Sequence, residues 1–201
     1  DDETVYSFRV STKFGTIVLS GGKSSTYDET CVLVIDTGKQ DTYLNLPSNR
    51  TAMNPISIVL DSNGDDRYLS EVPLRDTELE KWPQRGSAAG IPGPASAVLG
   101  YSILMDRTGN DLYRTHRNGI GSGRFGIAFC IDQGGNDTFD SYQDSQGFAT
   151  FGVGVLDDQA GNDNYFGFSQ VQACGQTGGV GMLIDRAGDD HYIANDTVID
   201  L

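Results

Sequence analysis

The chain has 201 residues with 28 acidic and 14 basic side chains, which gives a formal net charge of −14. This length suits one domain over residues 1–201, and the acidity excludes nucleic acid and anionic membrane surfaces as partners, because both require a basic surface. The acids are 23 Asp and 5 Glu beside 26 Gly, a turn-favouring composition that excludes a helical bundle. The apolar runs are far shorter than the roughly 20 residues of a membrane helix, so no membrane insertion is expected.

In chain order, the first recognisable element is IVLSGGKSSTY at residues 17–27, a degenerate copy of a unit that follows six times. It carries Ser where the later copies carry Asp. The six full copies align without gaps and are VIDTGKQDTY ending at Tyr43, VLDSNGDDRY at Tyr68, LMDRTGNDLY at Tyr113, CIDQGGNDTF at Phe139, LDDQAGNDNY at Tyr165 and LIDRAGDDHY at Tyr192. An internal repeat of this length is typical of a fold in which each unit stacks on its neighbours.

Three columns of the alignment are constant in character. The first-column aspartates are Asp36, Asp61, Asp106, Asp132, Asp158 and Asp185. The second-column aspartates are Asp41, Asp66, Asp111, Asp137, Asp163 and Asp190. An aromatic residue ends every copy, and Gly stands between the two aspartates in every copy except the first, which has Lys39. These columns predict one tight turn per repeat.

The first-column aspartates are spaced by 25, 45, 26, 26 and 27 residues. The long spacing indicates one repeat plus an insertion, which we place within residues 71–96 because that stretch breaks the pattern and carries four of the six prolines. A second glycine column at Gly121, Gly147 and Gly175 predicts another corner of the repeating coil.

A strand precedes each turn, because apolar residues stand five, three and one positions before the first-column aspartates. One strand-and-turn unit cannot bury its apolar face alone, whereas stacked copies form a continuous core. The sequence therefore predicts an all-β, right-handed parallel β-helix (β-solenoid) with coils of about 26 residues, the handedness following the rule for parallel crossover connections. The leucine-rich repeat signature is absent, and propeller blades need longer units.

The turns DxxG[ND]Dx[YF], above all GGNDTF at 134–139 and TGNDLY at 108–113, resemble the Gly- and Asp-rich repeats of haemolysin-type (RTX-like) calcium-binding proteins. The resemblance covers only these short turns. It implies Ca²⁺ bound by the twelve column aspartates along one corner. The chain departs from that family's pattern, because Asp replaces a glycine at the first column and the period is far longer.

Charge repulsion leads to the same expectation from the residues themselves. Stacked coils place like carboxylates about 5 Å apart, where neighbours repel by about 3 kcal/mol per pair. Hard oxygen ligands in quantity suit structural Ca²⁺, and Asp132, Asp137, Asp158, Asp163, Asp185 and Asp190 are the first candidates, because these three copies are contiguous. The alternative is that Asp and Gly only form the turns and bind nothing.

The expected function is a secreted or surface-exposed, non-catalytic module used for structure, adhesion or binding, with a glycan or protein partner. The alternative is a polysaccharide-acting or carbohydrate-binding β-helix in which the aromatic column lines a sugar-binding face. For that alternative, Asp157 and Asp158 resemble the carboxylate pair of polygalacturonase-type hydrolases, whose NTD, GHG and RIK motifs are absent. A bulge turning Asp157 to solvent is the simpler interpretation.

Other conspicuous residues predict no chemistry. Cys31 and Cys130 fall in strands several coils apart, too far for a disulfide, and we expect all three cysteines to be free. The two histidines lack metal-site spacing, and the basic cluster of Arg114, His116 and Arg117 is typical of a solvated loop. Because open strand edges invite pairing, we expect end-to-end self-association or a C-terminal continuation.

Overall fold

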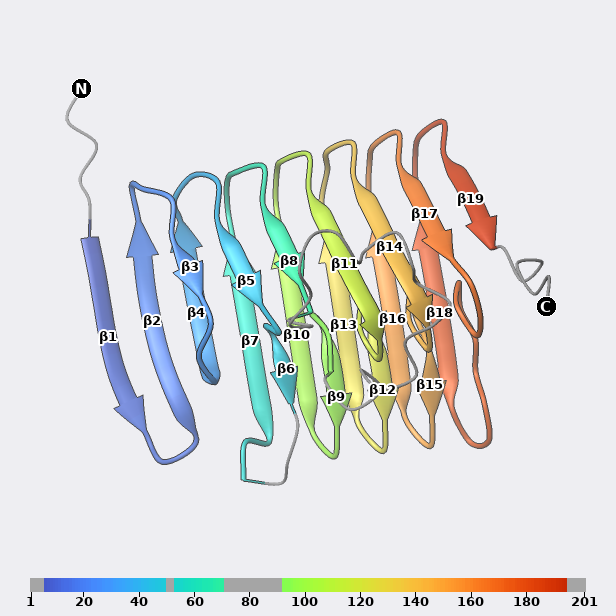
Figure 1. Cartoon of the computed structure of the whole chain (residues 1–201), viewed down its shortest axis with the longest axis horizontal. Helices are drawn as coiled ribbons and strands as arrows, with labels where there is room; N and C mark the ends of the chain where they lie inside the picture. Colours follow the sequence, from blue (N-terminus) through green and yellow to red (C-terminus); the bar gives the residue numbers. More distant parts are fainter. Residues whose placement is uncertain (1–5, 50–52, 71–91, 195–201) are drawn as a thin grey trace, which may run out of the picture.

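The computed structural model describes residues 6–49, 53–70 and 92–194, which form a β-solenoid without a helix (Figure 1). The described residues accordingly contain no helix long and apolar enough to cross a membrane. Residues 71–91 of the predicted insertion lie outside the described residues. Residues 92–96 belong to the solenoid instead, because Ser96 pairs in register with Ser48 and Ser122. The predicted boundary at 96 is therefore too late; the Pro-Gly-Pro run precedes a coil corner.

The strands stack into three sheets. Sheet A contains β1 (Tyr6–Thr12), β2 (Gly15–Gly21), β4 (Cys31–Thr37), β7 (Ile56–Asp61), β10 (Tyr101–Asp106), β13 (Ile127–Asp132), β16 (Val153–Asp158) and β18 (Val180–Asp185). Sheet B contains β3 (Thr26–Tyr27), β5 (Thr42–Leu44), β8 (Arg67–Leu69), β11 (Leu112–Arg117), β14 (Thr138–Gln143), β17 (Asn164–Gly167) and β19 (His191–Ala194). Sheet C contains β6 (Ser48–Asn49), β9 (Ser96–Val98), β12 (Ser122–Arg124) and β15 (Ala149–Thr150).

Identical positions of successive repeats are hydrogen-bonded neighbours, as the alignment predicts. Asp132 pairs with Asp106 on one side and with Asp158 on the other. The degenerate copy is also confirmed, because Ser20 pairs with Asp36, and Tyr27 pairs with Tyr43. The parallel stack ends at β1, which pairs antiparallel with β2 and was not predicted.

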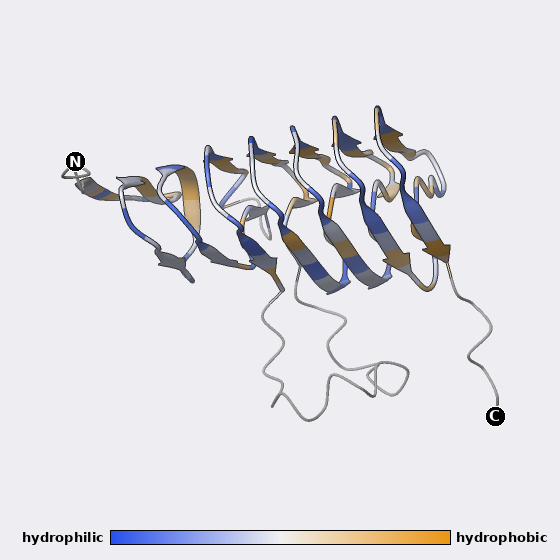
Figure 2. Cartoon of the chain, turned by 90° about the horizontal axis from the view of Figure 1, so that it is seen from above, coloured by the Kyte–Doolittle hydropathy of each residue, from blue (hydrophilic) through white to orange (hydrophobic). Residues whose placement is uncertain are grey.

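The orientation of sheet A reverses the prediction. The residues two positions before the first-column aspartates, such as Val59 and Leu104, are fully buried, and so are the aspartates themselves, except in the last copy, where Leu183 and Asp185 are partly exposed. Except for buried Cys31, the apolar residues at one, three and five positions before them lie on the opposite, outward face of the sheet. Figure 2 shows the hydropathy of the residues along the stacked strands. Alternation alone does not say which face is inside, because both faces of this sheet are rich in apolar residues.

Three rows of outward side chains, which we call the outer apolar face, cross sheet A. The first row is Val10, Ile17, Leu33, Ile58, Ile103, Phe129, Val155 and Met182. The second is Phe8, Leu19, Ile35, Leu60, Met105, Ile131, Asp157 and Ile184. The shorter third row is Ile56, Tyr101, Ile127, Val153 and Val180.

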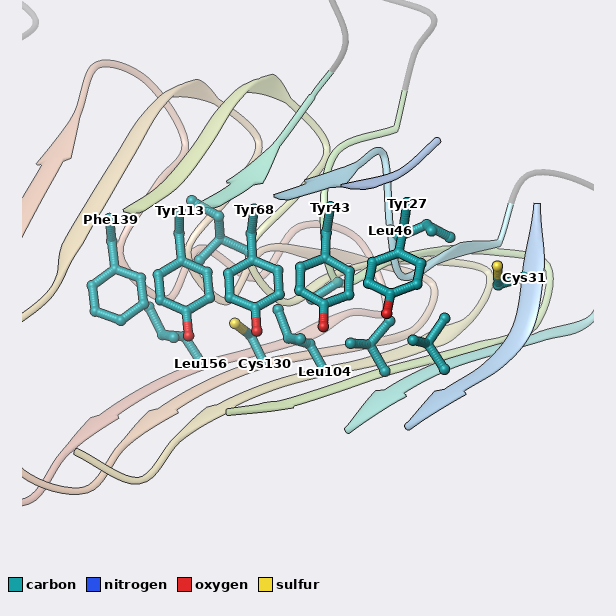
Figure 3. Packing of buried hydrophobic residues seen from close by; sticks show 14 of the residues in the cluster. Tyr27, Cys31, Tyr43, Leu46, Tyr68, Leu104, Tyr113, Cys130, Phe139 and Leu156 are labelled. Atoms are coloured by element: carbon teal, nitrogen blue, oxygen red, sulfur yellow. The ribbon is translucent and has the colours of Figure 1, made fainter. Parts of the chain in front are cut away.

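The core is a ladder of aromatic rings. Tyr27, Tyr43, Tyr68, Tyr113, Phe139, Tyr165 and Tyr192 stack with centroids 4.4–4.9 Å apart, and the labelled rings in Figure 3 point the same way. All of these rings except the last are buried against the inward residues of sheet A. A sugar-binding face built on this column is therefore wrong.

The second glycine corner is confirmed at two positions and corrected at a third. Gly121 and Gly147 take φ of +76° and +79°, and the equivalent residues are Ala95 and Ala173, not Gly175. A Cβ at Gly147 would overlap the carbonyl oxygen of Met182, because sheet C lies directly against sheet A here. Close backbone approach therefore explains these glycines.

Candidate metal centre

Each first-column aspartate ends a sheet A strand and begins the turn toward sheet B. In Asp36, Asp61, Asp106 and Asp132, Oδ1 accepts a hydrogen bond from the backbone N–H two residues on, for example from Thr108 to Asp106 at 3.1 Å and from Gly134 to Asp132 at 2.9 Å. This Asx-type turn is what Asp favours locally. It places the carboxyl on the inner side of the corner, where the side chain is buried.

The Oδ2 of every first-column aspartate accepts a hydrogen bond from a tyrosine hydroxyl of the ladder. The pairs are Tyr27 with Asp36, Tyr43 with Asp61, Tyr68 with Asp106, Tyr113 with Asp132, Tyr165 with Asp158, and Tyr192 with Asp185. These tyrosine–aspartate hydrogen bonds were not predicted from the sequence. The signal was present, because Phe occupies only one of the seven ladder positions, which indicates a need for the hydroxyl.

Phe139 changes which coil supplies the donor. Up to Tyr113, each hydroxyl donates to the aspartate of the next coil, whereas Tyr165 donates to Asp158 of its own coil at 2.7 Å. Phe139 has no hydroxyl, so Asp158 takes its donor from Tyr165. The extra tyrosine of the degenerate copy, Tyr27, is the reason that every first-column aspartate still has one donor.

Removing one hydroxyl tests this arrangement. Tyr68→Phe leaves the ring in the stack but deprives buried Asp106 of the donor at 2.5 Å. We expect the free energy of unfolding to fall by about 1–3 kcal/mol, the cost of an unsatisfied buried acceptor. Urea denaturation measures it, with the exposed Tyr101→Phe as the control that should change little. Equal stability of the two variants would contradict the role assigned to the hydroxyl.

The second-column aspartates form a ladder between coils. The Oδ1 of Asp111 accepts a hydrogen bond from the backbone N–H of Asp66 at 2.6 Å, and Asp137 accepts one from Asp111 at 2.7 Å. The same backbone N–H to Oδ1 hydrogen bond connects the other coils. The remaining pairs are Ser25 with Asp41, Asp41 with Asp66, Asp137 with Asp163, and Asp163 with Asp190. One oxygen of each carboxyl is thus committed to the stack.

The other oxygen of these carboxyls has no N–H or O–H donor. Among the described residues, this holds for the buried Oδ2 atoms of Asp41, Asp66, Asp111, Asp137 and Asp163, and for Oδ1 of Asp158. Oxygens from neighbouring carboxyls converge within 4.8 Å in four acidic triads. The triads are Asp41–Asp61–Asp66, Asp66–Asp106–Asp111, Asp111–Asp132–Asp137 and Asp137–Asp158–Asp163.

The triads hold their protons tightly in the absence of a cation. Burial, followed by repulsion from neighbouring carboxylates, raises the pKa of Asp66 and Asp111 to about 9 and that of Asp137 to about 10. Burial also raises the pKa of Asp61 to about 6 and of Asp106 to about 7, with the tyrosine hydrogen bond opposing the rise. Second-column carboxyls are the more perturbed because they have fewer donors.

Nine of the twelve aspartates predicted as calcium ligands lie in the triads. Asp36, Asp185 and Asp190 lie outside them. Asp36 faces the degenerate copy, where Ser20 and Ser25 stand at the aspartate columns. Asp185 and Asp190 belong to the last described coil and are partly exposed. The triads therefore extend along the middle of the solenoid, further toward the N-terminus than the three contiguous copies singled out from the sequence.

Asp157 and Asp158 do not form a carboxylate pair. They are neighbours on β16, so Asp158 faces the interior while Asp157 faces outward in register with Ile131 and Ile184. The strand has no bulge there, and Asp157 accepts two hydrogen bonds from Arg186, each 2.8 Å long. The predicted bulge is wrong, and the pair lacks the shared face that joint catalysis would need.

The basic cluster lies on a strand and is not a solvated loop. Arg114 pairs with Asp140 at 2.8 Å, and Arg117 pairs with buried Asp144 at 2.9 Å. Both partners come from β14 or the residue after it, one coil further along. The three cysteines are free, as predicted.

No family model, curated protein or solved structure matches the chain. The fold and the site nevertheless define a class: a β-solenoid repeat protein with a row of acidic triads inside one corner.

Proposed function

We propose that the chain is a structural β-solenoid module that binds Ca²⁺ at its acidic triads. The observation that carries the proposal is the set of buried carboxylate oxygens that converge without any donor. An unpaired buried charge is costly, so each triad requires either protons or a cation.

Charge and donor type favour a divalent hard cation. Each coil adds one first-column and one second-column carboxylate, so one divalent ion per coil balances the charge of the row. All the possible metal ligands in the triads are carboxylate oxygens, the ligand type that Ca²⁺ prefers, and Ca²⁺ tolerates irregular geometry better than Mg²⁺. The residues therefore fit calcium, with water or backbone carbonyls completing its six to eight ligands.

A bound ion would act on stability, because it binds the folded chain and not the unfolded one. Weak calcium sites fill at the millimolar concentrations found outside cells. We therefore propose a secreted or surface-exposed module whose stiffness depends on calcium and which serves structure, adhesion or binding.

Calorimetric titration of metal-free protein at pH 8 tests the proposal. We expect about four ions per chain, one for each triad, and a melting temperature that rises with Ca²⁺ and falls with chelator. Asp111→Asn should remove more than one ion, since Asp111 belongs to two triads. Asp65→Asn, an exposed neighbour of the turns, is the matched control. No binding heat and an unchanged melting temperature would contradict calcium binding and would mean that the triads are neutralised by protons alone.

A further inference from the structure

Among the described residues, the outer apolar face is a surface separate from the acidic triads. Two of its rows extend across all eight strands of sheet A, and one of them contains Asp157 among its apolar residues. Several of its side chains are widely open, with Tyr101, Val180 and Met182 between 44% and 52% exposed. Monomeric proteins rarely expose contiguous apolar patches above a few hundred Å².

A shallow groove extends this surface at the edge of sheet A. Phe125 and Phe151 stack at 5.0 Å on the corner before β13 and β16, and both rings are more than half exposed. Gly126 and Gly152 floor the groove beside them, so the backbone is open to contact. The apolar surface therefore continues from the strands onto the corner.

Charge does not protect the face from association. Asp157 is the single charged side chain in its three rows, and Arg186 neutralises it. The aspartates that give the chain its acidity lie mainly in the turns and triads at the far end of the strands. A partner seated here would meet little repulsion.

The dimensions of the face match those of a stable dimer interface. Two rows of eight positions and one of five, spaced about 4.8 Å between strands and about 6.6 Å between rows, give roughly 670 Å². A standard interface buries about 800 Å² on each partner. Two such sheets pack face to face at about 10 Å, as in a β-sandwich.

We propose that this face is the interface of a homodimer, in which the sheet A surfaces of two copies pack against each other. A second copy has the same flatness, strand spacing and lack of charge. The described residues that flank 71–91 adjoin β8 of sheet B and β9 of sheet C and not sheet A, so a second copy, and not this segment, is our chosen occupant. The inference does not rest on calcium binding.

Light scattering of the full chain after size exclusion tests the proposal, with calcium and with chelator. We expect a mass of two 21.6 kDa chains for the wild type. Phe129→Lys places a charge at the centre of the face and should halve the mass, whereas Phe129→Leu should keep the dimer. Ile193→Lys, on the exposed last strand β19, should also keep it, which separates this interface from end-to-end pairing. Circular dichroism confirms folding, and Ile103→Lys replaces Phe129→Lys if that variant unfolds.

Three results would overturn the homodimer. One is a dimer that survives both lysine substitutions in the face but not Ile193→Lys. Another is a monomeric wild type that binds an apolar dye on this face, which would indicate a different partner. The third is a monomer that binds the dye only when residues 71–91 are deleted, which would assign the cover to the chain itself.

Discussion

Raising the pH from about 5 to about 9 is expected to lower the melting temperature of the calcium-free protein by many degrees. The second-column carboxyls cause this loss. Their pKa values of about 8 for Asp41, about 9 for Asp66 and Asp111 and about 10 for Asp137 exceed the value of about 3.9 in the unfolded chain.

The sign follows from proton binding. A carboxyl with a raised pKa holds its proton more tightly in the folded state, so its contribution to stability is complete below about pH 4. That contribution is lost as the pH rises toward the folded pKa values, because burial then opposes the charged form. The window of falling stability therefore extends from about pH 4 to about pH 9 or 10.

Calcium should reverse this dependence, since it replaces the protons of the triads. We expect its stabilising effect to grow over the same pH range and each binding event to release protons, which calorimetry in buffers of different ionisation enthalpy measures. Asp111→Asn should flatten the pH profile, and Asp65→Asn should not. A metal-free melting temperature that is constant or rises over this range would contradict the assignment of buried, proton-holding carboxyls.

The second large effect is expected at the turn glycines. Gly109 has φ of +155°, and a Cβ there would overlap the carbonyl oxygen of Gly64 in the preceding coil. The obstacle is the backbone of Gly64, which cannot move without separating the coils. We expect Gly109→Ala to lower the free energy of unfolding by more than about 4 kcal/mol, measured by urea denaturation.

Gly134, one position earlier in the turn of the next coil, offers a control, because its φ of +156° is nearly the same while the nearest atom to an added Cβ, the carbonyl oxygen of Ala160, is 3.4 Å away. Gly134→Ala should cost only the backbone strain of about 1–3 kcal/mol. The difference between the two variants isolates the effect of coil contact. Equal losses would show that conformation alone, and not the close approach of stacked turns, requires glycine at this column.

These predictions share one cause, which is that the repeat places the same turn residues of successive coils next to one another. An Asp that would cap a turn in any loop here meets the same Asp of the coils on either side, as Asp132 meets Asp106 and Asp158. Its charge is then repelled by the equivalent carboxylates of the neighbouring coils. A tyrosine hydroxyl donates to every first-column aspartate, whereas most second-column aspartates keep one oxygen without a donor.

The repeat by itself determined the parallel stacking, the positions of the strands and turns, and the neighbour relations of the column residues. These follow from spacing alone, because equal spacing places equal residues side by side whichever way a strand faces. The register of Ser20 with Asp36 was visible in this way, even though the first copy lacks its aspartates.

Only the tertiary structure decided which face of each strand lies inside. Val59 and its neighbours Ile58 and Leu60 are all apolar, so alternation alone left the choice of face open, while Asp ordinarily prefers contact with water. Closure of the coil opposes that preference, because it brings a tyrosine hydroxyl or a backbone N–H to each aspartate. Those donors come from other coils or from the far side of the turn, so no local pattern in the sequence could assign them. The same closure turned the predicted core residues outward and made them the outer apolar face.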